Sequence, residues 1–311
     1  MKLSELQLLK SQQFVVNETG QFLHHYYHFI AELLLGTWAF FYGAFNPASR
    51  LTEISDTFIV NSPYPSFNPL SASYRPPPLS RMILLNAKDP EWRDRPGVNP
   101  YFLRAAFPSL DIEDTDDWNE RCASTFIDPR NPDAPGNAWH LPMALLVDRS
   151  AANRGKACSR TQRMAAEAWD YMRNKGGIDP FGIWWDQVRY AIYRFARVEK
   201  STRSFSAPLK DKDISDPQKL LPPPPDKVVI TYINRQSVGR HLNPNDHDGL
   251  LDAIQDLIAK KQAEGKNWVF RDVKPEILSK AKQVQLASET TVGCRRLNAA
   301  LANMLLINDR Y

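Results

Sequence analysis

The chain has 311 residues, of which 43% are hydrophobic and 24% charged, a composition that excludes disordered and collagen-like proteins. The net charge of +4 is small for this length, which argues against a nucleic-acid-binding protein with a densely basic face. Three cysteines are too few for a disulfide-rich scaffold and lack the paired spacing of a zinc site.

Near the start, residues 24–45 read HHYYHFIAELLLGTWAFFYGAF. This stretch is apolar from residue 30 onward except for Glu32 and Thr37, and it is shorter than the ~20 residues that a membrane-spanning helix needs. An acidic side chain would also cost about 2.5 to 3.5 kcal/mol at the centre of a bilayer. We therefore expect a buried helix, whose core residues are Leu33, Leu34, Trp38 and Phe41. No signal peptide or membrane anchor is visible before it.

On a helix, His24, His28 and Glu32 recur every four residues and share one face. Three interpretations remain open. The polar groups bond to neighbouring backbone, or the histidines belong to a metal site whose third ligand is absent, or Glu32 orients His28 as a general base.

Two proline-rich segments interrupt the chain. Residues 63–78 predict an extended surface connection, and residues 200–226 are charged and end in four consecutive prolines, which is typical of a semi-rigid linker. We predict an N-terminal α/β domain at residues 1–205, a linker at 206–226, and a C-terminal domain at 227–311.

Two segments on either side of the linker share one plan, a strand followed by two arginines and a helix. The first has a strand at 144–147, then Asp148, Arg149 and Arg154, and a helix at 161–174. The second has a strand at 228–233, then Arg235 and Arg240, and a helix at 246–262 capped by Asn245 or Asp246.

A further strand at 267–273 and a helix opening on Pro275 follow. Alternating strands and helices predict parallel sheets, and ligands of such sheets bind beyond the carboxyl ends of the strands. Arginines at those ends suit a diphosphate, whose oxygens accept paired hydrogen bonds from a guanidinium; ordinary solvated arginines are the alternative. Three Asp-x-Asp triplets, at 114–116, 211–213 and 246–248, are discounted as metal ligands because their contexts are acidic surface, linker and helix start.

Three blocks occur in the order YYHFIAELLLGTW, LLVDRSAANRGKACSRTQRMAAEAW and VVITYINRQSVGRHL, and together they resemble the fungal branch of glycosyltransferase family 61. The resemblance implies a GT-B-like pair of Rossmann-type domains that transfers a sugar with inversion. The donor would be a UDP-linked nucleotide sugar, and the acceptor a glycan or glycoprotein. No metal or other cofactor, and no nucleic acid, is implied. Members of the family usually reside in the ER or Golgi lumen, where membrane association would need a segment missing from this chain.

The resemblance also assigns roles to residues. His28 and Glu32 match the catalytic acceptor-side block, with His28 as the base. Arg235, Ser237 and Arg240 match the donor-binding block. Apart from the resemblance, the matching strand-end arginines of the two segments suggest a shared cleft, which Asp148, Arg149 and Arg154 would line.

The chain departs from the family pattern after its last predicted helix. A glycine-containing loop that should cradle the donor phosphates is missing from residues 289–311, and so are the strands that should complete the second sheet. We therefore expect the second domain to be incomplete and the chain to be truncated at its C-terminus. A non-catalytic member that binds a partner or a glycan is the alternative.

Overall fold

The computed structural model describes residues 6–8, 12–45, 78–126, 129–131, 138–152, 183–198, 226–237 and 241–295. The chain divides into two compact units, Met1–Pro180 and Phe181–Tyr311. Residues 63–77 and the predicted linker up to residue 225 lie outside the described residues, so the domain bounds given above stay predictions.

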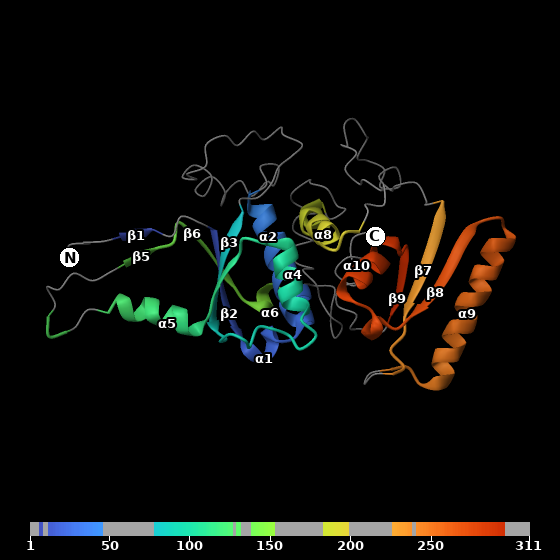
Figure 1. The fold of residues 1–311 in the computed structure, drawn as a ribbon, viewed down its shortest axis with the longest axis horizontal. Coiled ribbons are helices and arrows are strands. Elements are labelled where there is room, and N and C mark those ends of the chain that lie inside the picture. Colours follow the sequence, from blue (N-terminus) through green and yellow to red (C-terminus); the bar gives the residue numbers. More distant parts are fainter. Residues whose placement is uncertain are drawn as a thin grey trace, which may run out of the picture. The chain divides into compact units, whose positions relative to one another are not determined.

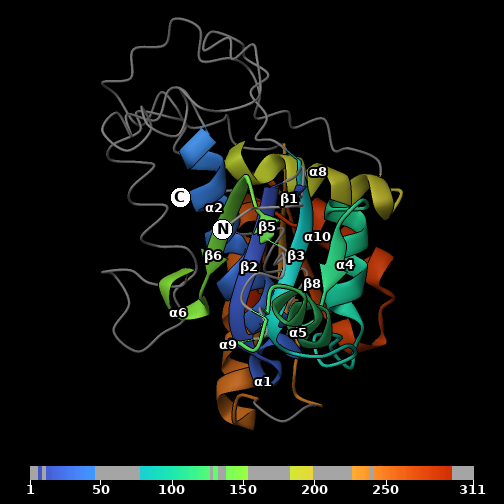
Figure 2. The same ribbon diagram turned by 90° about the vertical axis from the view of Figure 1, so that its left-hand side faces the viewer.

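A parallel sheet organises the first unit (Figures 1 and 2). Its strands, in the spatial order β4-β3-β2-β6, are β2 (Gln12–Thr19), β3 (Leu79–Asn86), β4 (Asp111–Glu113) and β6 (Met143–Val147). A second parallel ladder joins β1 (Leu6–Leu8) to β5 (Ala138–His140). The chain adds β3 and β4 on one side of β2 and then returns to add β6 on the other side, so the strand order reverses at β2.

Parallel strands require crossover connections, and helices supply them. The helical segments of the first unit are α1 (Gly20–Leu23), η1 (Tyr27–Leu34), α2 (Leu35–Phe45), α4 (Val98–Ala106), α5 (Thr115–Ser124) and α6 (Arg149–Ala152). The core between sheet and helices includes Phe14, Phe29, Ile30, Leu33, Met82, Ile83 and Phe102, all fully buried.

The sequence predicted β6 but not β2 or β3, although both are central to the sheet. Phe14 of β2 lies opposite Met82 of β3 and Leu145 of β6, so it is covered on both sides by apolar neighbours. Their apolar runs, FVV in β2 and MILL in β3, are too short to be recognised without this pairing.

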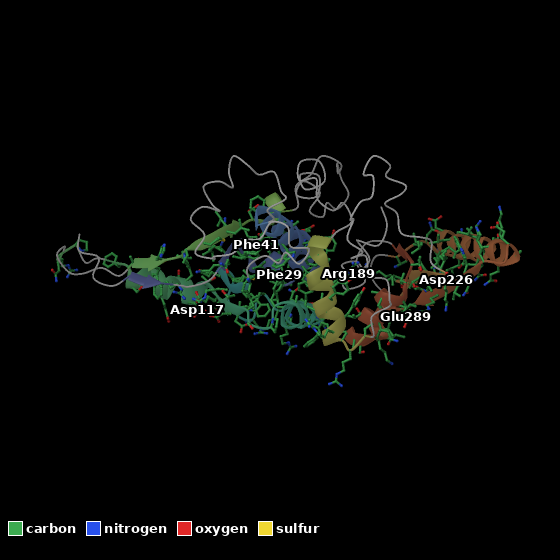
Figure 3. The ribbon with its side chains drawn as sticks, turned by 90° about the horizontal axis from the view of Figure 1, so that it is seen from above. Phe29, Phe41, Asp117, Arg189, Asp226 and Glu289 are labelled. Atoms are coloured by element: carbon green, nitrogen blue, oxygen red, sulfur yellow. The ribbon has the colours of Figure 1, made fainter. Side chains whose placement is uncertain are left out.

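Residues 27–45 form the predicted helix, and Leu33, Leu34, Trp38 and Phe41 are all buried. Figure 3 labels Phe29 and Phe41 on this helix, which is drawn in blue within the first unit. Among the residues that the structure describes, no helix is long and apolar enough to cross a membrane.

The helix differs from the prediction at its start. Its first part, η1, is π-helical, with i to i+5 hydrogen bonds, and continues directly as α2. His24 lies outside it, because His24 forms the C-terminal cap of α1. The expected alignment of three side chains on one helix face is therefore wrong for His24, while His28 and Glu32 both lie on η1.

The second unit contains a three-stranded parallel sheet of spatial order β8-β7-β9, made of β7 (Lys227–Ile233), β8 (Asn267–Val273) and β9 (Val292–Arg295). Its helical segments are α8 (Ile183–Phe195), α9 (Pro244–Ala263), η3 (Pro275–Ile277) and α10 (Lys280–Glu289). The predicted strands at 228–233 and 267–273 and their parallel arrangement are confirmed.

β9 corrects the expectation that the tail adds no strand to the second sheet. It pairs with β7 in parallel, with Val292 opposite Ile230 and Arg295 opposite Ile233. Because β8 and β9 flank β7, this strand order also reverses, at β7.

Helix α9 lies along β8 and closes the core of this unit (Figure 1). Its cap is Asn243, whose side chain accepts a hydrogen bond from the amide of Asp246, instead of Asn245 or Asp246 themselves. Pro244 explains the earlier start, since proline favours the first helical position. Pro275 begins only a single 3-10 turn, and α10 starts at Lys280 after the capping side chain of Ser279.

Apolar side chains from β7 and α9 form the core of the second unit, namely Val228, Ile230, Ile254 and Ile258 with Leu250, Trp268 and Phe270 packed against them. Both units are thus of the α/β class with parallel sheets, as predicted.

Candidate active site

Polar side chains converge at the carboxyl edge of the first sheet, where the strand order reverses. Glu18 lies at the end of β2 and Arg149 lies two residues after β6, while η1 carries His28 and Glu32. Open α/β sheets bind ligands at this kind of position, because the crossovers on either side of the reversal diverge and leave a crevice.

Glu32 is the centre of the cluster. Its side chain is only 7% exposed, and its Oε2 accepts hydrogen bonds from His28 Nδ1 at 2.6 Å and from Arg149 Nη1 at 2.9 Å. The structure therefore joins a predicted catalytic pair to one of the residues predicted to line the cleft.

Arg149 is held on other sides as well. Its Nε lies 3.3 Å from Glu18 Oε2, and its guanidinium carbon lies 4.1 Å from the centre of the Phe22 ring, a cation–π arrangement. Two carboxylates and an aromatic face thus fix the guanidinium in one orientation.

The charge state of Glu32 follows from these contacts. Burial alone would raise the pKa of Glu32, but the hydrogen bonds and charges of His28 and Arg149 outweigh burial and hold the pKa below its ordinary value. Glu32 is therefore an ionised carboxylate at neutral pH.

His28 is the accessible member of the cluster, with 33% of its side chain exposed. The ring packs edge-on against Phe22 at a centroid distance of 5.5 Å and lies 5.0 Å from the ring of His25. Since Nδ1 is bonded to Glu32, a neutral His28 that donates from Nδ1 carries its lone pair on Nε2.

His25 adds a second imidazole beside His28. Burial and the nearby charges of His28 and His24 lower the pKa of His25, against the opposing attraction of Asp94. Its Nδ1 accepts a hydrogen bond from the amide of Tyr27 at 3.2 Å. His25 is therefore neutral at pH 7 and adds no positive charge to the site.

Gly36 allows α6 to approach the helix that carries the site. A Cβ atom at position 36 would lie 2.1 Å from the carbonyl oxygen of Ala152, which is closer than any real contact. Because α6 begins with Arg149, this close approach brings the guanidinium toward Glu32.

The remaining cleft residues are placed only in part. Asp148 lies between β6 and Arg149, and its carbonyl oxygen accepts a hydrogen bond from the amide of Ala152 at 2.9 Å. Arg154 lies outside the described residues.

The predicted donor-binding residues belong to the second unit. Arg235 and Ser237 follow the carboxyl end of β7, as expected, whereas Arg240 lies outside the described residues. Ser237 Oγ donates a hydrogen bond to Glu276 Oε1 at 2.5 Å, and Asn234 Nδ2 donates one to Asp272 Oδ2 at 3.1 Å. Carboxylates therefore lie beside the residues predicted to hold a diphosphate.

Sequence reasoning missed Glu18, Phe22 and His25. Glu18 carried a usable signal, since it follows the apolar run of β2 in the way that Arg149 follows β6. Phe22 and His25 carried none, because only the fold shows what lies beside their rings.

The Asp-x-Asp triplets have structural explanations where they are described. Asp114 caps α5, and Asp246 lies in the first turn of α9, which begins at Pro244, while residues 211–213 lie outside the described part of the chain. In the described ranges, no group of three or more His, Cys, Asp or Glu side chains is arranged to hold a metal ion.

No family model, curated protein or solved structure matches the chain. The chemistry of the side chains is therefore the guide to function. A buried ionised carboxylate that fixes a partly exposed imidazole at a sheet edge is an arrangement suited to proton transfer.

Proposed function

We propose that the protein is a glycosyltransferase that transfers a sugar, with inversion, from a UDP-linked donor to a hydroxyl of a glycan or glycoprotein. The 2.6 Å contact between His28 Nδ1 and Glu32 Oε2, at the edge where α/β sheets bind ligands, carries this proposal. The resemblance of three blocks to glycosyltransferase family 61 supplies the reaction class.

In the proposed reaction, His28 Nε2 takes the proton of the acceptor hydroxyl as its oxygen attacks the anomeric carbon of the donor sugar. The bond from that carbon to the diphosphate breaks, and the diphosphate leaves with the electron pair. Glu32 keeps the imidazole in the required tautomer and stabilises the imidazolium that forms, which is the role of a positioning carboxylate.

Arg149 has a supporting role in this scheme. Its Nη1 lies 2.9 Å from Glu32 Oε2, so it shares the negative charge of Glu32 and holds that carboxylate in place beside His28. Arg235, Ser237 and Arg240 would bind the departing diphosphate through charge-assisted hydrogen bonds.

The finer fold and the setting belong to the same proposal. We infer a GT-B-like pair of Rossmann-type domains, of which the parallel sheets with reversed strand order are the supporting feature. The proposed compartment is the lumen of the ER or Golgi, and the proposed mechanism requires no metal.

One observation favours a second candidate, a non-catalytic relative that binds a glycan or a protein partner. Ser237 is bonded to Glu276, and a carboxylate beside the proposed diphosphate position would repel that ligand. In this case the protein would bind its ligand without releasing UDP.

The test is release of UDP from a panel of UDP-sugars, with and without glycan acceptors. We expect the wild-type protein to release UDP and His28→Ala to lower kcat by about 10² to 10⁴-fold, the usual loss on removal of a general base. His24→Ala is the matched control, because His24 is exposed and bonds only to the carbonyl of Gly20 within the described residues. UDP release by His28→Ala at the wild-type rate would exclude His28 as the base.

A further inference from the structure

The first unit contains a pocket of about 430 Å³, which is in the size range of small-molecule sites. None of the residues that line it belongs to the His28 cluster. It is lined by the segment after β3, by α4 and the residues that lead from it into β4, and by the start of α5. Apolar side chains that line it include Leu103, Phe107 and Leu110.

Charged side chains line the rest of this pocket, and their signs are mixed. They are Asp89, Arg93, Arg104, Asp114 and Asp117. Two positive and three negative groups give a net charge of −1, which argues against a phosphate or nucleotide as ligand.

The two arginines differ in what holds them. Arg93 Nε donates to Asp89 Oδ1 at 2.8 Å, and its guanidinium lies 4.2 Å from the ring centre of Trp92, so it is fixed in place. Arg104 Nε donates to the carbonyl of Pro100 at 3.1 Å, and within the described ranges no other group bonds to its guanidinium. The terminal nitrogens of Arg104 are therefore available as donors.

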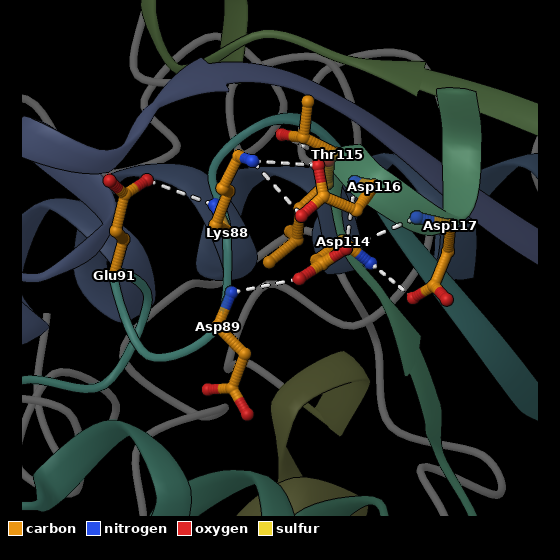
Figure 4. Close-up of polar contacts among 8 residues, drawn as sticks. Lys88, Asp89, Glu91, Asp114, Thr115, Asp116 and Asp117 are labelled. Atoms are coloured by element: carbon orange, nitrogen blue, oxygen red, sulfur yellow. Dashed lines mark hydrogen bonds and ion pairs between the residues drawn. The ribbon is translucent and has the colours of Figure 1, made fainter. Parts of the chain in front are cut away.

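The acidic side of the pocket is also fixed (Figure 4). The Asp114 side chain accepts hydrogen bonds from the amides of Asp89 and Asp117, while Asp117 Oδ2 accepts one from the Asp114 amide at 2.9 Å. This capping box leaves Asp117 Oδ1 as an acceptor in a side chain that is already ordered.

We propose that this pocket binds a neutral sugar residue, as a subsite for the acceptor glycan. Sugar hydroxyls both donate and accept hydrogen bonds, which suits an arginine beside a fixed carboxylate, and the C–H faces of a sugar suit Leu103 and Phe107. Binding of the sugar rests on the pocket alone; its description as an acceptor subsite rests on the proposed transferase function.

The position of the pocket along the sheet fits that subsite. Two of its lining residues, Asp89 and Asp114, follow the carboxyl ends of β3 and β4, and the His28 cluster lies at the carboxyl ends of β2 and β6. Two strand spacings amount to about 10 Å, a distance that one or two sugar residues can cover. Asn99 ties the two regions together, because its Nδ2 donates to the carbonyl oxygens of both Leu23 and Trp92.

The test is the binding of methyl glycosides of glucose, galactose, mannose and xylose to the full chain. Saturation-transfer NMR detects this binding in the absence of any UDP-sugar donor. We expect at least one glycoside to bind, and Arg104→Gln and Asp117→Asn each to weaken it about tenfold, the loss of one hydrogen bond to a charged group. Arg95→Gln is the matched control, since Arg95 is exposed and does not line the pocket.

Circular dichroism of each variant shows whether the fold is retained, and Asp117→Asn keeps an acceptor for the capping box. The proposal is overturned if no glycoside binds, or if both folded variants bind as the wild type does. Glycoside binding that depends on Arg104 in a protein that never releases UDP would leave the sugar site standing and refute the transferase. If the protein transfers sugar and neither variant changes the KM for the acceptor, the transferase proposal would stand and the acceptor subsite would be refuted.

Discussion

The carboxyl edges of the two sheets are built differently. At the first edge, Glu32 is 7% exposed and is bonded to both an imidazole and a guanidinium. At the second edge, the corresponding polar contact joins Ser237 to Glu276 among exposed side chains. The first edge therefore carries a charge that is shielded from water, whereas the Ser237–Glu276 contact at the second edge is open to water.

This difference bears on function because burying a charged side chain lowers the stability of the fold. Taking a carboxylate and a guanidinium out of water costs several kcal/mol each, and an apolar replacement is often equally stable or more so. The cluster around Glu32 is thus poorly explained as a stabilising device, and a functional role accounts for it better. An exposed pair such as Ser237 with Glu276 carries no comparable implication.

The largest predicted effect is on the packing of Trp38, which lies on the helix that continues from η1 at the first edge. Trp38 is 6% exposed and packs against Phe41 and Phe107 at ring-centroid distances of 5.7 and 5.3 Å. Trp38→Ala should lower the free energy of unfolding by about 3 to 5 kcal/mol, through lost burial and a residual cavity. Urea unfolding measures this value.

Phe40→Ala on the same helix is the control for Trp38→Ala. Phe40 is 55% exposed, so we expect a change of about 0.5 kcal/mol or less. Equal losses for the two variants would show that this helix does not pack as described and would remove the contrast between the two edges.

A glycine in a helix of each unit sharpens the comparison. At Gly36 a methyl group would meet the Ala152 carbonyl, so Gly36→Ala should cost about 1 to 3 kcal/mol through overpacking. At Gly249 a Cβ meets nothing within 4 Å, so Gly249→Ala in α9 should raise stability by about 0.5 to 1 kcal/mol.

The thermal midpoints of these two variants should therefore move in opposite directions. A stabilising alanine at position 36 would mean that α6 does not approach α2 closely, and the contact between Arg149 and Glu32 would lose its structural basis.

The parts of the molecule that local patterns determine could be predicted. β8 has the predicted bounds, and the burial of Trp38 follows from the apolar run that contains it. The pairing of His28 with Glu32 could be predicted too, because four residues separate them on one helical segment.

The parts that depend on strand pairing could not. Arg149 meets Glu32 and Glu18 only because β6 pairs with β2, across more than a hundred residues of sequence. The third strand of the second sheet, β9, was missed for a related reason, since four residues carry too little pattern to be recognised without their partner strand.

The next prediction compares how the stability of the fold depends on pH through one carboxylate in each unit. The pKa of Glu32 is lower in the folded protein than in the unfolded chain, where it is about 4.3. The ionised Glu32 therefore contributes its full stabilisation of the fold above about pH 4.3, and this stabilisation is lost as the pH falls through the lower pKa of the folded state. Glu32→Gln should cost about 1.5 kcal/mol at pH 7, as expected for hydrogen bonds to a charged group, and less in strong acid. Urea unfolding of both proteins across this range measures the difference.

Glu289 in the second unit provides the matched comparison. Burial would raise its pKa, but hydrogen bonds from Arg271 and Gln285 outweigh burial and lower it. Because its side chain is 40% exposed, Glu289→Gln should change stability by about 0 to 1 kcal/mol, with the same sign of pH dependence. A larger effect at Glu289 than at Glu32 would contradict the contrast between a buried and an exposed carboxylate.

The smallest predicted difference lies in the helix caps. The Asp114 side chain accepts two amides of the first turn of α5 and also the amide of Asp89 at 2.9 Å, so it joins the helix to the segment after β3. The Asn243 side chain accepts a single amide of α9. Asp114→Ala should therefore cost about 1 to 2 kcal/mol and Asn243→Ala about 0.5 to 1 kcal/mol, both measured by urea unfolding. Equal costs would indicate that the bond to Asp89 adds nothing, because the helix caps alone would then explain both values.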